Sequence, residues 1–104
     1  MEELNNQERF GDFKNRISEI FKTEGLSENL LAEVEKWHNR RYEETDRQGG
    51  TIEQRITFQM ELAEIYLITE RVDLALEILD DAWTQADQEG LQDLAAKIGD
   101  IIRG

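Results

Sequence analysis

The sequence contains no cysteine and no proline in its 104 residues, and it has a single histidine. Without cysteine there is no disulfide framework, no thiol nucleophile and no thiolate-ligated zinc or iron–sulfur site. Proline usually marks turns and irregular loops, so its absence favours a helical chain. We expect no metal and no cofactor.

Long apolar segments are also missing. The longest wholly apolar run covers residues 65–68, far short of the roughly 20 residues that span a bilayer. The chain begins Met1-Glu2-Glu3, without the basic and apolar regions of a signal peptide. These features predict a soluble, cytoplasmic protein that does not bind membranes.

Positive charge is scarce. Lysine and arginine number 12 against 24 aspartates and glutamates, which gives a net charge of −12. Such a chain is poorly suited to nucleic acid, because phosphate binding needs basic side chains, and it favours basic protein partners. Residues 1–48 carry 8 basic and 12 acidic side chains, whereas residues 51–104 carry 4 and 12. The negative charge is therefore concentrated in the second half.

The residues that are abundant predict an all-α protein with five antiparallel helices. Glutamate, glutamine, leucine and alanine are frequent, and no segment sustains a two-residue alternation. Apolar spacing places the helices at about 6–23, 28–47, 51–69, 73–88 and 91–102.

Capping residues mark several helix ends. Gly25 and Gly90 suit the left-handed conformation that often follows a helix. Ser27 is a good N-cap, and Thr51 with Gln54 has the spacing of a capping box. Each half of the chain is small for independent stability. We therefore expect one domain over residues 1–104, in which a helical hairpin (1–48) docks on the C-terminal half (51–104).

The third expected helix is apolar nearly all the way round. A helix of this kind is normally covered on several sides. The apolar residues that produce this pattern are Ile52, Ile56, Phe58, Met60, Leu62, Ala63, Ile65, Tyr66, Leu67 and Ile68.

Residues 56–89 resemble a tetratricopeptide repeat (TPR), a helix–turn–helix unit of 34 residues. The resemblance implies that small residues such as Ala63 and Ala75 let two antiparallel helices approach closely. Two positions depart from the family: Gln59 stands at its tryptophan position and Asp87 at its proline position. The matching positions are Leu62, Ala63, Tyr66, Ala75, Leu79 and Ala82.

The expected repeat array is incomplete. Leu94, Ala95 and Ile98 reproduce the spacing of the first three matching positions, so the last helix is either a truncated repeat or a cap. Stable arrays usually need about three repeats. The array must be completed by the hairpin of residues 1–48, by a second copy in a homodimer, or by a partner.

The resemblance also implies a binding groove along the first helix of the repeat. Its apolar members suit an amphipathic helix or an extended peptide; alternatively, the N-terminal hairpin buries them. Acidic Glu61 and Glu64 disfavour capture of a carboxylate terminus, so a basic or apolar segment is expected. The implied groove residues are Thr57, Met60, Glu64, Leu67 and Ile68.

Three local patterns have both structural and functional interpretations. Glu35 and His38 have the Glu-x-x-His spacing of di-iron bundles, but such a site needs two copies of the motif, so we expect a partly buried histidine. Residues 38–42 form a basic cluster, either an ion-paired helix face or a contact for an acidic protein. The third pattern is a cluster of acidic residues, which forms either a solvated helix face or a docking surface for a basic protein. Its members are Asp80, Asp81, Asp87, Glu89 and Asp93.

No catalytic pattern is present: the sequence has no phosphate-binding glycine loop, no Gly-x-Ser-x-Gly elbow and no His-Glu-x-x-His pair. We therefore expect a non-enzymatic protein interaction module, acting as an adaptor, chaperone-like holder or assembly subunit. Two alternatives remain open. One is an acidic inhibitor that mimics nucleic acid on a basic protein, and the other is a homo-oligomeric structural subunit.

Overall fold

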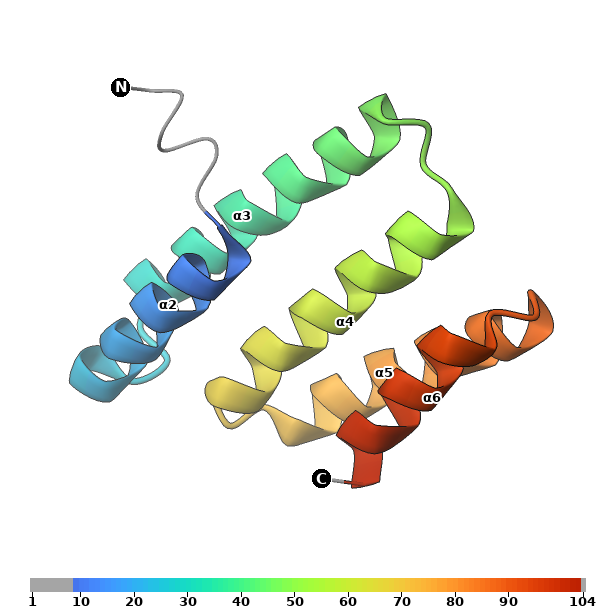
Figure 1. The fold of residues 1–104 in the computed structure, drawn as a ribbon. Helices are drawn as coiled ribbons and strands as arrows, with labels where there is room; N and C mark the ends of the chain where they lie inside the picture. The colour runs from blue at the N-terminus through green and yellow to red at the C-terminus, as the bar shows by residue number, and fades with distance from the viewer. Residues whose placement is uncertain (1–8, 104) are drawn as a thin grey trace.

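The computed structural model describes residues 9–103, which form five α-helices and no strand (Figure 1). The predicted all-α fold is confirmed, and consecutive helices reverse direction. The expected start of the first helix at Asn6 and the N-terminal segment from Met1 lie outside the described residues. The helices are α2 (Phe10–Glu24), α3 (Glu28–Arg47), α4 (Ile52–Ile68), α5 (Val72–Gln88) and α6 (Gln92–Arg103).

The expected capping residues set the helix ends. Ser27 caps α3, where its Oγ accepts a hydrogen bond of 3.1 Å from the backbone N–H of Leu30. Thr51 and Gln54 form the predicted capping box at the start of α4, with reciprocal bonds of 3.1 and 3.2 Å. Gly25 follows α2 with φ of 68°, a conformation that side chains with a Cβ disfavour.

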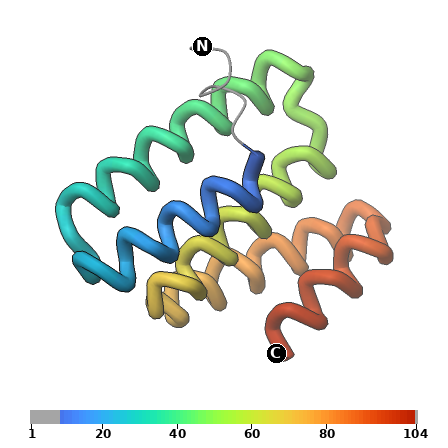
Figure 2. The backbone as a smooth tube through the Cα atoms, turned by 60° about the vertical axis from the view of Figure 1, so that its left-hand side comes forward, coloured from blue at the N-terminus to red at the C-terminus, as the bar shows by residue number. Residues whose placement is uncertain are grey.

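Helix α4 runs through the middle of the molecule, between the α2–α3 hairpin and the α5–α6 pair (Figure 2). It contributes buried residues to two separate hydrophobic cores. The first core joins α4, α5 and α6, and the second joins α2, α3 and α4. This arrangement confirms the expectation that the third helix is covered on several sides.

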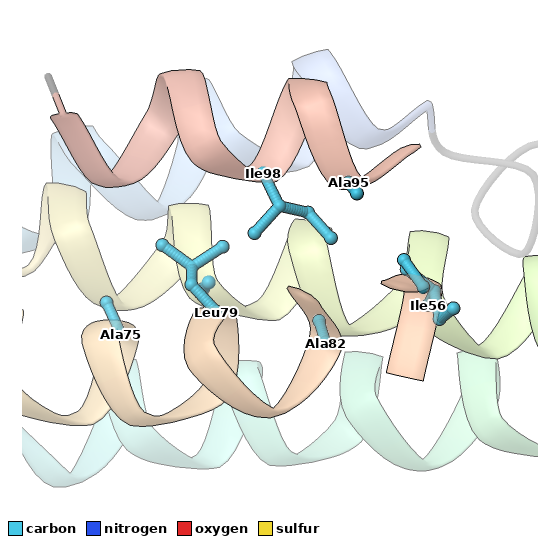
Figure 3. Close-up of a cluster of buried hydrophobic side chains, with 8 residues drawn as sticks. Ile56, Ala75, Leu79, Ala82, Ala95 and Ile98 are labelled. Carbon is cyan, nitrogen blue, oxygen red and sulfur yellow. The ribbon is translucent and has the colours of Figure 1, made fainter. Parts of the chain in front are cut away.

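In the first core, α5 contributes mostly small residues. Ala75, Ala82 and Ala86 are fully buried there, and short side chains allow helix axes to approach closely. Ile98 of α6 lies against this surface near Leu79 (Figure 3). The buried members are Ile56, Ala63, Ala75, Leu79, Ala82, Ala86, Ala95 and Ile98.

The second core is aromatic. Trp37 is only 3% exposed and stacks on Phe13 with ring centroids 5.0 Å apart. Phe10 and Phe58 pack against the same indole at 5.8 and 5.7 Å. Phe58 belongs to α4, so the stack ties the N-terminal hairpin to the central helix. The buried members are Phe13, Ile17, Leu30, Val34, Trp37, Phe58 and Ile65.

Candidate protein-binding cleft

The five predicted groove residues lie on one flank of α4, but they have different surroundings. Met60 and Leu67 are half-buried against the first core, and Ile68 is half-buried against the second. Thr57 is exposed, and its hydroxyl donates to the backbone carbonyl of Glu53 at 2.9 Å. The sequence left two alternatives for these residues, an open groove or a surface buried by the N-terminal hairpin. Their exposure is intermediate between the two.

The N-terminal hairpin reaches this flank through an ion pair. Lys14 Nζ of α2 lies 3.6 Å from Oε1 of Glu64, the remaining predicted groove residue. Both side chains are partly solvated, so the pair contributes at most about 1 kcal/mol. The contact nevertheless places α2 beside the predicted groove residues.

A cleft opens on the opposite flank of α4, between α3, α4 and α5. Its volume is about 470 Å³, within the range of ligand-binding pockets, and its lining is mainly apolar. None of the five predicted groove residues lines it. The side chains that shape it include His38 and Tyr42 from α3, Phe58, Gln59 and Leu62 from α4, and Ile78 from α5.

Gln59 gives the cleft a specific polar feature. Its Oε1 is buried and accepts no hydrogen bond, and it is the only such side-chain nitrogen or oxygen within residues 9–103. A buried acceptor without a donor is unfavourable, and natural structures contain few of them. Rotation of the Gln59 side chain towards the cleft would let a bound segment that offers an N–H or O–H group supply the missing hydrogen bond.

The α3 wall of the cleft is aromatic. His38 is half-buried, with its ring centroid 5.1 Å from that of Phe58. Tyr42 stands at the mouth and is 61% exposed. The partly buried histidine agrees with the structural interpretation of the Glu-x-x-His spacing. No cluster of three metal-binding side chains occurs in the part of the chain that the structure describes.

The predicted basic cluster is used within the fold. The Nε and Nη2 of Arg41 both donate to Oε1 of Glu61 on α4, at 3.2 and 3.1 Å. Arg41 also lies 3.9 Å from Glu44 in its own helix. Burial raises the pKa of Glu61, and the guanidinium of Arg41 opposes that effect. Arg41 of this cluster therefore links α3 to α4.

Sequence reasoning missed this site because it looked on the other flank of α4. One available signal was Gln59, a long polar residue in a helix that is otherwise apolar on nearly every side. The remaining wall could not be deduced from helix periodicity, since it depends on how α3 and α5 approach α4.

Comparison with known proteins provides no family, because no family model, curated protein or solved structure matches the chain.

Among residues 9–103, every helix is too short or too polar to cross a membrane.

Proposed function

We propose that the protein is a non-enzymatic protein interaction module that binds an apolar or basic segment of a partner in the cleft between α3, α4 and α5. The observation that carries the proposal is that Gln59, whose buried Oε1 has no hydrogen-bond partner, lines a mainly apolar hollow. Apolar side chains of the segment would fill the hollow, and a donor from the same segment would bond to Gln59.

The resemblance to a TPR supports this proposal. The resembling residues 56–89 span α4 and α5, and four of the six matching positions are completely buried between these helices and α6. Gln59 occupies the position at which the repeat has tryptophan. A smaller side chain at that position leaves more space beside α4, which is where the cleft lies.

The shape of the cleft favours binding of a protein segment over binding of a small-molecule ligand. The cleft is open to solvent along one side, and exposed Tyr42 and Ile52 form part of its rim. Grooves between helices commonly bind amphipathic helices through a few anchoring side chains. A partner helix could place one anchor near Phe58 and cover the rim residues with its neighbours. The composition suggests that this binding takes place in the cytoplasm.

Selection from a displayed library of helical peptides tests the proposal. Peptides selected on the wild-type protein should bind the double variant Tyr42→Ser and Ile52→Ser at least about tenfold more weakly, since two rim contacts are lost. The matched control is Leu26→Ser with Leu31→Ser, which removes two other exposed apolar residues, away from the cleft.

Comparing the two double variants distinguishes specific binding in the cleft from unspecific apolar binding to the protein surface. Equal loss in both double variants would indicate unspecific apolar binding, and no loss in the rim variant would refute binding at the cleft. Circular dichroism of each variant checks that the fold is retained, which is expected because all four residues are exposed.

A further inference from the structure

Helix α5 carries a second apolar surface, separate from the cleft. Val72, Leu76 and Trp83 are 47%, 41% and 40% exposed. Their spacing of four and seven residues places them on one face of the helix, over a length of roughly 16 Å. We call these three residues the α5 strip. The cleft contacts α5 through Ile78 and Gln85, on the other side of its buried face.

A row of carboxylates borders the α5 strip. Asp73, Asp80 and Asp87 are exposed and recur every seven residues, so they also share a face. Asp80 follows Leu76 by four residues and Asp87 follows Trp83 by four, which makes them neighbours on the helix surface. These three aspartates form no ion pair with any residue from 9 to 103.

We propose that the α5 strip and its aspartate row dock a basic amphipathic helix of a protein partner. The apolar side of that helix would cover the α5 strip, and lysines or arginines along its edge would lie against the aspartates. The surface combines an exposed apolar strip with unpaired charge of one sign, which gives complementarity to such a helix.

The charge also argues against the two other available occupants. A second copy docked through the same face would bring two aspartate rows together, and like charges across an interface are unfavourable. Residues 1–8 of the chain carry three glutamates and no lysine or arginine, so this segment is also a poor match for the row.

The test uses a synthetic helical peptide of about 18 residues, with leucines along one face and lysines along its edges. A second peptide has glutamate in place of every lysine, and a third has the composition of the first in scrambled order. Binding of fluorescein-labelled peptides to the full chain is measured by anisotropy. Only the first peptide should bind strongly.

Variants locate the binding on α5. Asp73→Asn, Asp80→Asn and Asp87→Asn together should weaken binding of the first peptide about tenfold at low salt, since each exposed pair contributes modestly. Leu76→Ser should weaken it as well. The control variant changes the net charge equally through Asp12→Asn, Glu35→Gln and Glu43→Gln, all exposed on α2 and α3, and should bind almost as tightly as wild type.

Salt and fluorescence provide independent measurements. Raising sodium chloride from about 50 to 500 mM should bring the wild-type affinity close to that of the triple Asn variant, because salt screens exposed charges. Trp83 is exposed and Trp37 is buried, so acrylamide quenching reports mainly on Trp83. Bound peptide should protect that fluorescence from quenching.

Several outcomes would overturn the proposal. These are tight binding of the glutamate peptide, equal losses in the α5 and control variants, or unchanged quenching of Trp83. Self-association in sedimentation experiments that Leu76→Ser abolishes would identify a second copy as the occupant instead. The Tyr42→Ser and Ile52→Ser variant should bind the lysine peptide normally, so failure here is distinguishable from failure at the cleft.

Discussion

Replacing Gln59 by leucine should stabilise the protein, in contrast to most substitutions within a helical core. Oε1 of Gln59 is buried without a donor, and an unsatisfied buried acceptor costs about 1–3 kcal/mol. Leucine and glutamine have similar helix propensities, so the backbone contribution changes little. The glutamine is half-buried as a whole, which favours the lower end of that range. We expect the free energy of unfolding to rise by about 1 kcal/mol.

Urea denaturation followed by circular dichroism measures this change. A gain of about 1 kcal/mol corresponds to a Tm increase of roughly 4–8 °C for a domain of this size. Gln88→Leu is the matched control, because Gln88 is exposed near the end of α5. That variant should stay within about 0.5 kcal/mol of wild type.

A decrease or no change in stability for Gln59→Leu would refute the reasoning. It would show that the Gln59 carbonyl already has a partner, such as an ordered water in the cleft. If stability rises as expected, the same variant should bind the selected peptides more weakly, since leucine cannot accept their hydrogen bond. Opposite changes in stability and binding are typical of residues retained for function.

Three further substitutions test the packing and the charges. Trp37→Ala should lower the free energy of unfolding in urea by about 3–5 kcal/mol, because it leaves a cavity in the second core. A small decrease would mean that the aromatic side chains are not tightly packed. Ala75→Leu should cost about 1–3 kcal/mol through overpacking, whereas exposed Ala96→Leu should be nearly neutral. A hydrogen bond from Arg16 lowers the pKa of Glu33, so its stabilisation is present at neutral pH and is lost as pH falls through the lowered value. Glu33→Gln should therefore flatten the acid side of a Tm–pH curve, and an unchanged curve would contradict the assignment.

The sequence predicted the helices well because local chemistry determines their ends. Ser27 and the Thr51–Gln54 pair bond to backbone groups a few residues away, so short-range patterns suffice to place them. The central position of α4 was also predictable, since a helix that is apolar on nearly every side needs neighbours on several sides.

The cleft could not be predicted in the same way. Helix periodicity indicates which residues are apolar, but not which neighbouring helix covers them. Met60 and Leu67 are covered mainly by the first core, whereas Phe58 and Leu62 border a cleft that α3 and α5 leave open. The position of that opening depends on how three helices approach one another, which no single segment encodes.

The sharing of α4 between two cores has an evolutionary consequence. A substitution on either side of this helix disturbs packing with a different part of the chain, so few changes there are tolerated independently. The outer faces of α3 and α5 meet solvent and carry Tyr42 at the rim of the cleft and the α5 strip. Exposed positions on α3 and α5 can therefore change with little effect on packing and alter partner preference, while the buried positions of α4 keep the scaffold constant.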